Sequence, residues 1–189
     1  MADALTVPFA VAAIVLCVAG AAKLRDPWPA VRAVASVLVG RASGVAGGSG
    51  WLAGGRAAAA LLRVLAAGEI AVGVWCVLAP GRAAALVLTG AYACFCGLSL
   101  VLARRRVACG CFGGHDAPAS LAQPLLSAAL AAVAVAAAVR TPQGLAWVLG
   151  RPVANAGVLA LAIGAAVYAT VLVHTELPAL WTAWSGRQV

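Results

Sequence analysis

The sequence predicts an all-α membrane protein: a four-helix transmembrane bundle plus one additional C-terminal transmembrane helix. The first observation is composition, because 65% of the 189 residues are hydrophobic and only 10% are charged. A soluble domain is about half apolar and about a quarter charged. The second observation is that five apolar segments approach the ~20 residues that a helix needs to cross a bilayer core. Lipid is therefore the expected solvent for most of the chain.

The five predicted spans cover residues 5–22, 57–79, 83–103, 121–139 and 153–173. Each is expected to be helical in lipid, because a helix pairs its backbone polar groups within the segment. Pro8 is tolerated in the first turn of the first span, and Pro80 with Gly81 predicts a tight turn after the second. The residues before the first span include Asp3 and no Lys or Arg, so we expect a retained helix rather than a cleaved signal peptide.

The longest connection, residues 23–56, joins the first two spans. Val31, Val34 and Leu38 fall on one helical face, which predicts a short interfacial helix over residues 29–39. Residues 44–55 are rich in Gly and Ser and are typical of a flexible connection. We therefore divide the chain into a transmembrane bundle of four helices, residues 1–140, and a fifth helix with the C-terminal tail, residues 141–189.

The net charge of +8 does not indicate nucleic-acid binding, because the basic residues lie between apolar runs rather than on one helical face. We expect the lipid bilayer as the main partner and a multi-pass protein of the cell membrane. One face holds ten basic residues: Lys23, Arg25, Arg32, Arg41, Arg56, Arg63, Arg104, Arg105, Arg106 and Arg187. The other holds three: Arg82, Arg140 and Arg151. The positive-inside rule places the richer face in the cytoplasm.

Cys109 and Cys111 are the strongest chemical feature of the sequence. They flank Gly110, and only Val107 and Ala108 separate Cys109 from the arginines that end the third span. Two cysteines this close predict a strained disulfide that is easily reduced, which suits thiol exchange rather than stapling. The neighbouring arginines favour the thiolate, which is the reactive form. The motif predicts a redox-active dithiol of the kind that a thiol–disulfide oxidoreductase uses. Unpaired thiols in a loop are the alternative.

Glu69 lies inside the second apolar run, where a carboxylate is costly and usually has a partner within the bundle. Lys23 and Arg25 end the first span on the same predicted face, so either could pair with it. The functional interpretation is a proton carrier for thiol chemistry. A structural ion pair is the alternative.

Two other functions stay open. Cys109, Cys111 and His115 have a spacing that could hold Zn or Cu(I), although no fourth ligand is near unless Asp116 serves. We predict no bound cofactor and do not assign these residues as metal ligands. A non-catalytic membrane scaffold is the other alternative. The remaining cysteines, Cys17, Cys76, Cys94 and Cys96, are expected to act as small apolar side chains.

The order of these features resembles the MauE family of methylamine-utilisation membrane proteins, which is related to the DoxX-like group. Three motifs carry the resemblance: Ala19-Gly20-Ala21-Ala22-Lys23-Leu24-Arg25-Asp26-Pro27, then Gly68-Glu69 with Gly73, then Cys109-Gly110-Cys111-Phe112-Gly113. The matching region covers roughly residues 5–140. The lengthened first connection and the fifth helix depart from the family pattern.

The resemblance implies a four-helix bundle and a role in disulfide formation or electron delivery for an exported redox enzyme. It implies a thioredoxin-like or periplasmic partner and a link to methylamine metabolism. Residue by residue, Cys109 and Cys111 match the cysteine motif, whereas Lys23, Arg25, Asp26 and Glu69 match the polar positions. The charge count instead places the cysteines in the cytoplasm, where a dithiol could accept electrons from a thioredoxin.

Overall fold

The computed structural model describes residues 2–39, 55–105 and 121–176, and this part of the chain is built from helices joined by short connections. Five helices are long and apolar enough to cross a membrane. They are α1 (Ala2–Arg25), α4 (Arg56–Leu78), α5 (Arg82–Arg105), α6 (Ala122–Val139) and α8 (Val153–Thr175). The predicted all-α membrane fold is confirmed, and each predicted span lies within three residues of its observed bounds.

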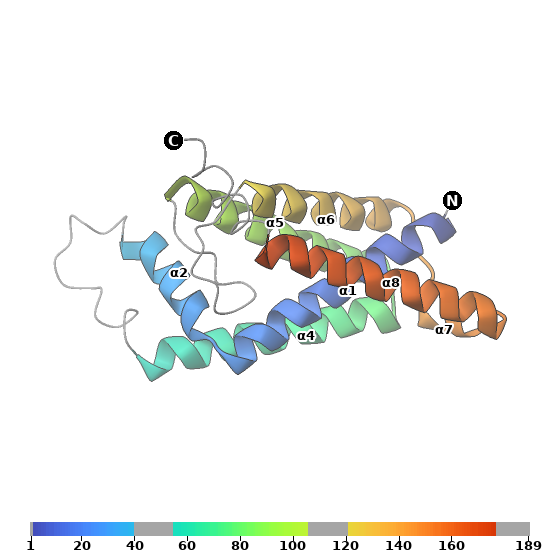
Figure 1. Cartoon of the computed structure of the whole chain (residues 1–189), viewed down its shortest axis with the longest axis horizontal. Helices are drawn as coiled ribbons and strands as arrows, with labels where there is room; N and C mark the ends of the chain where they lie inside the picture. Colours follow the sequence, from blue (N-terminus) through green and yellow to red (C-terminus); the bar gives the residue numbers. More distant parts are fainter. Residues whose placement is uncertain (1, 40–54, 106–120, 177–189) are drawn as a thin grey trace.

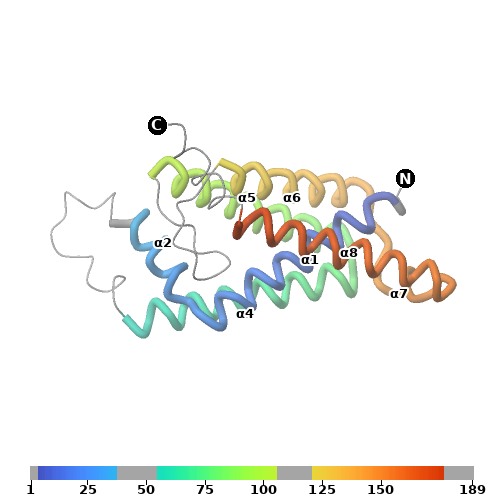
Figure 2. The backbone as a smooth tube through the Cα atoms, viewed as in Figure 1, coloured from blue at the N-terminus to red at the C-terminus, as the bar shows by residue number. Residues whose placement is uncertain are grey.

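The long helices alternate in direction, so that α1, α5 and α8 run one way and α4 and α6 run the other (Figure 1). The tube in Figure 2 shows the same order, with α1 passing through the middle of the assembly. The ends of α1, α5 and α8 and the starts of α4 and α6 therefore meet at one end of the bundle. We call this the Arg105 end, after the last described residue of α5.

The hydrophobic core centres on α1, whose central turns are almost completely buried. Small side chains such as Ala12 and Ala13 let neighbouring helices approach closely, while Leu16 and Leu88 fill the space between them. The most extensive helix pairs are α1 with α4 and α5 with α6. The core therefore comes from the four helices that the sequence assigns to residues 1–140.

Helix α8 packs on the outside of this core. Ile163, Ala166 and Val167 contact the buried cluster, but no residue of α8 is itself buried. Its outward side chains include Val153 and Leu161, which are 90% and 76% exposed. An exposed apolar surface of this kind is typical of a helix that faces lipid or another apolar partner. The fifth span is thus a peripheral helix rather than a core element.

Two shorter helices complete the described fold, α2 (Trp28–Val39) and α7 (Leu145–Leu149). The predicted short helix is observed as α2, which folds back over the Arg105 end and packs against α4 and α5. Ala33 and Leu102 form a small buried cluster there. The Arg105 guanidinium donates a hydrogen bond of 2.8 Å to the Ser36 carbonyl oxygen. Helix α7 was not predicted, because five residues give no readable period.

Candidate functional site

An ion pair joins α1 to α4 near the Arg105 end. The Lys23 Nζ atom donates hydrogen bonds to both carboxylate oxygens of Glu69, at 2.6 Å and 2.7 Å. The side chains are only 6% and 15% exposed, respectively. The structure thus pairs Glu69 with Lys23, one of the two partners that the sequence allowed. A carboxylate inside a bundle is typical of an ion or proton pathway or of a structural pair.

Close packing of α1 against α4 makes this ion pair possible. A Cβ atom on Gly20 would lie 2.7 Å from the Ala66 carbonyl oxygen, and one on Gly73 would lie 2.6 Å from the Ala13 carbonyl oxygen. Real Cβ atoms do not approach so closely, so both positions require glycine. Glycines at helix crossings allow backbones to approach in membrane proteins. Lys23 follows Gly20 by one helical turn and is thereby held against Glu69.

One aromatic ring of α5 covers the ammonium group, and a second packs against the first. The Lys23 Nζ atom lies 4.6 Å from the centroid of the Phe95 ring, within the range of a cation–π interaction. Tyr92 packs edge-on against Phe95, with ring centroids 6.1 Å apart. The Tyr92 hydroxyl donates a 2.6 Å hydrogen bond to the Ala12 carbonyl oxygen. Helix α5 therefore contacts α1 at two points, through Phe95 on Lys23 and through Tyr92 on Ala12.

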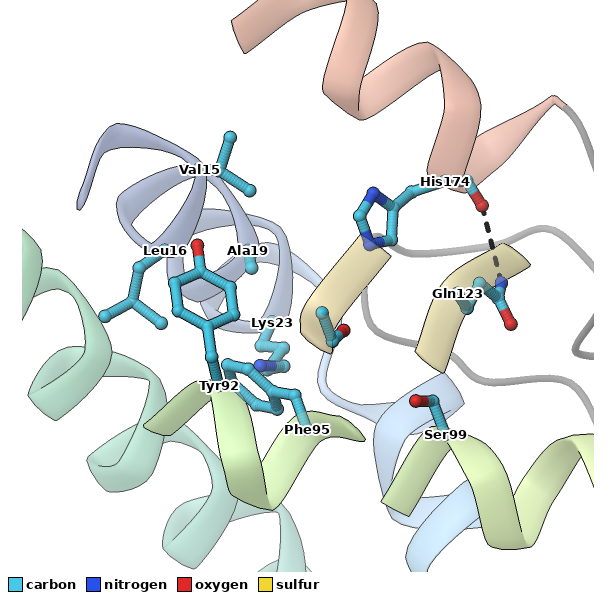
Figure 3. A pocket seen from close by; sticks show the side chains of 10 residues that line it. Val15, Leu16, Ala19, Lys23, Tyr92, Phe95, Ser99, Gln123 and His174 are labelled. Atoms are coloured by element: carbon cyan, nitrogen blue, oxygen red, sulfur yellow. Dashed lines mark hydrogen bonds between the residues drawn. The ribbon is translucent and has the colours of Figure 1, made fainter. Parts of the chain in front are cut away.

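A small cavity lies beside the ion pair, between α1, α5, α6 and the end of α8 (Figure 3). Its volume is about 30 Å³. Aliphatic and aromatic side chains form much of the wall. Six residues with polar side chains also line it: Lys23, Tyr92, Ser99, Gln123, Ser127 and His174. The Gln123 Nε2 atom donates to the His174 carbonyl oxygen at 3.4 Å, which ties α6 to α8.

The other predicted site residues fall into two groups. Arg25 and Asp26 are exposed, and neither joins the ion pair in the described structure. The Asp26 Oδ1 atom accepts a 3.1 Å hydrogen bond from the Trp28 backbone N–H, so this carboxylate shapes the turn before α2. Cys109 and Cys111 lie outside the described residues, as do His115 and Asp116.

The four cysteines of the described spans are unpaired. Cys17 and Cys76 donate to backbone carbonyl oxygens of Ile70 and Ala84, at 3.7 Å and 3.5 Å. Cys96 donates to the Pro124 carbonyl oxygen at 3.4 Å, whereas Cys94 is exposed. These contacts agree with the prediction that such cysteines act as small side chains.

Sequence reasoning missed Tyr92, Phe95, Gln123 and Ser127, which surround the ion pair or the cavity. A signal was present for two of them, because Gln123 and Ser127 are polar residues four positions apart within an apolar span. Such residues usually face the interior of a bundle. The aromatic residues gave no signal, since Tyr and Phe are ordinary in a membrane helix.

Comparison of the chain with protein-family models, curated proteins and solved structures finds no match. The resemblance to the MauE family therefore rests on the sequence motifs alone. The geometry that follows from the described residues is a buried, hydrogen-bonded ion pair beside a small cavity with polar groups, inside a membrane bundle.

Proposed function

We propose that this protein is an integral membrane thiol–disulfide redox protein in which Cys109 and Cys111 form the exchanging pair. The observation that carries the proposal is the Lys23–Glu69 ion pair, which is shielded from lipid and lies near the Arg105 end. Desolvated charged groups are typical of functional sites. In this proposal Lys23 and Glu69 are positioning and proton-handling residues, and the cysteines carry the electrons.

The reaction is a thiol–disulfide exchange that needs no bound oxidant. When the protein is the electron donor, a Cys109 or Cys111 thiolate attacks a partner disulfide and forms a mixed disulfide. The second cysteine then forms the Cys109–Cys111 bond and releases the partner as a dithiol. Two electrons pass to the partner, and the two protons lost by the cysteines end on the partner thiols. The reverse direction reduces this protein instead.

Chain length supports a functional link between the cysteines and the ion pair. Cys109 follows Arg105 by four residues, and an extended chain spans at most about 3.6 Å per residue. Four residues therefore reach at most about 14 Å from the end of α5. Lys23 lies in the last turn of α1, at the same end of the bundle. Arginines before Cys109 favour its thiolate.

The direction of electron flow depends on the side of the membrane. The positive-inside rule favours the cytoplasm for the Arg105 end and hence a thioredoxin-like partner. The MauE resemblance favours service to an exported redox enzyme, with methylamine metabolism as the implied process. We propose the cell membrane as the location and a thioredoxin-like protein as the partner. A Cys/His metal site and a non-catalytic scaffold are the alternatives that the experiment below separates from this function.

Maleimide gel-shift analysis in membrane vesicles tests the proposal. The starting variant carries Ala at Cys17, Cys76, Cys94 and Cys96, so that only the proposed pair can react. After DTT, two maleimide groups should add, and after mild diamide neither should add. The Cys109→Ser variant is the matched control and should keep one reactive thiol in both conditions. Two permanently reduced thiols under oxidant would overturn the redox function, and near-stoichiometric metal that is lost on substitution would favour the metal site.

A further inference from the structure

The cavity beside Lys23 has a size that restricts what it can hold. A water molecule needs at least about 10–15 Å³ of such space, whereas a benzene ring occupies a cavity of about 150 Å³. The volume of about 30 Å³ is enough for one or two waters and is well below that of a benzene-sized cavity. Size alone therefore favours water over an organic cofactor.

Gln123 provides an independent observation. Gln123 is 9% exposed, and its Oε1 atom is buried without a hydrogen-bond partner among the described residues. The Nε2 atom faces the His174 carbonyl oxygen, which fixes which atom of the amide is left as acceptor. A buried acceptor without a protein partner usually binds ordered water, because leaving it unsatisfied costs about 1–3 kcal/mol.

The polar groups around the cavity supply further partners. An ammonium group has three N–H donors, and Glu69 accepts from two of them. The Ser99 and Ser127 side chains line the same cavity from α5 and α6, at 3% and 5% exposure. A buried water typically makes two to four hydrogen bonds, which this set can provide.

We propose that this cavity is a water-binding site through which the Lys23 ammonium group exchanges protons with the Arg105 end of the bundle. In each exchange an N–H bond of Lys23 breaks as an O–H bond forms on the bound water, and that water releases another of its protons to solvent at the Arg105 end. The reverse step returns a proton to Lys23, so no oxidant or reductant is needed. The value of this exchange for thiol chemistry rests on the proposed function, but the water site itself does not.

Solid-state NMR of the protein in lipid vesicles tests the site directly. Lys23 is the single lysine of the chain, so ¹⁵N-lysine labelling gives one side-chain amine signal. Magnetisation transferred from water should reach this signal rapidly in the unmodified protein. The chain has three glutamines, at 123, 143 and 188, so glutamine labelling resolves the Gln123 amide in the same way. Absence of rapid transfer to both side chains in the unmodified protein would overturn the proposal.

Two variants test the role of the cavity residues. Gln123→Leu should lower the transfer of magnetisation from water to the Lys23 amine about fivefold. One hydrogen bond contributes about this factor to water binding. Ser127→Val fills part of the cavity and should act in the same direction. Gln143→Leu is the matched control on the exposed connection before α7 and should leave the amine signal unchanged. Unchanged transfer in both cavity variants, with the Lys23 shift preserved, would contradict the proposal.

The same spectra separate this proposal from the thiol function. The measurement is repeated on the protein with Cys109→Ser and Cys111→Ser. Rapid water transfer to Lys23 in that variant would support the water site. If the starting variant of the gel-shift assay, which keeps both cysteines, then shows permanently reduced thiols, the redox function is removed. Redox-active thiols without water at Lys23 would do the opposite.

Discussion

Lys23 and Glu69 form a bidentate ion pair across the α1–α4 interface, with both Nζ–oxygen distances below 2.8 Å. Lys23 lies in the last turn of α1, whereas Glu69 lies near the middle of α4. The first half of α4 consequently extends beyond α1, where α2 packs against it (Figure 1). The ion pair therefore sits where the compact part of the bundle ends.

Breaking this pair should destabilise the protein strongly. Lys23→Met leaves a carboxylate buried without a partner, and Glu69→Leu leaves a buried ammonium group. Loss of one partner of a buried pair costs about 3–5 kcal/mol. The double variant should recover most of that loss, since an apolar pair suits a membrane interior. SDS-induced unfolding followed by tryptophan fluorescence measures the difference, and equal stability of single and double variants would argue against a coupled pair.

Glycine at position 73 should be essential to the α1–α4 contact. Gly73→Ala forces a Cβ atom against the Ala13 carbonyl oxygen and the Cys17 side chain. Overpacking of this kind costs about 1–3 kcal/mol. Gly68→Ala is a matched control, because a Cβ atom there meets nothing within 4 Å. The same unfolding assay should show a loss for the first variant and none for the second. Equal tolerance at both positions would refute the close helix contact.

The Tyr92 hydroxyl should contribute a smaller increment. Tyr92→Phe removes the hydrogen bond to the Ala12 carbonyl oxygen while keeping the ring that packs on Phe95. We expect a loss of about 0.5–1.5 kcal/mol, the usual net value of one hydrogen bond. Tyr168→Phe on the exposed surface of α8 should be neutral in the same measurement. A neutral Tyr92→Phe would show that this bond adds nothing to the α1–α5 contact.

Cysteine labelling from each side of intact cells should separate the two ends of the bundle. In a variant without native cysteines, Arg25→Cys and Arg104→Cys should react from one side, and Arg82→Cys from the other. The alternating helix directions require this pattern, and the positive-inside rule predicts the cytoplasm for the first two. Labelling of Arg25→Cys and Arg82→Cys from one side would contradict a transmembrane α4.

The span pattern was readable from the sequence because lipid imposes simple demands. Apolar length and composition decide which segments cross, so even α8, which buries no residue, could be predicted. Glu69 stood out as a charge inside an apolar run. The sequence left Lys23 and Arg25 as alternative partners for it, and the structure identifies Lys23 as the partner. At Arg25 the helix has turned toward the surface, which the sequence pattern does not show.

The remainder of the site depends on helix rotation, which composition does not fix. Phe95 covers Lys23, and Tyr92 bonds to Ala12, because α5 presents this face to α1. Gln123 and Ser127 line the cavity because α6 turns its polar side inward. The residues around them form a nearly uniform apolar run, which gives little directional pattern, so packing against neighbouring helices decides the rotation of α6. Cys109 and Cys111 remain predictions from sequence.

The rate of thiol exchange in a folded protein without the ion pair tests the central claim most directly. The Lys23→Met and Glu69→Leu double variant is compared with Arg82→Met, which removes an exposed charge at the opposite end. Oxidation of Cys109 and Cys111 by a thioredoxin disulfide is followed by gel shift. General acid–base help contributes about 10²–10⁴-fold, so the double variant should exchange at least about a hundredfold more slowly. An unchanged rate in the folded double variant would contradict the account.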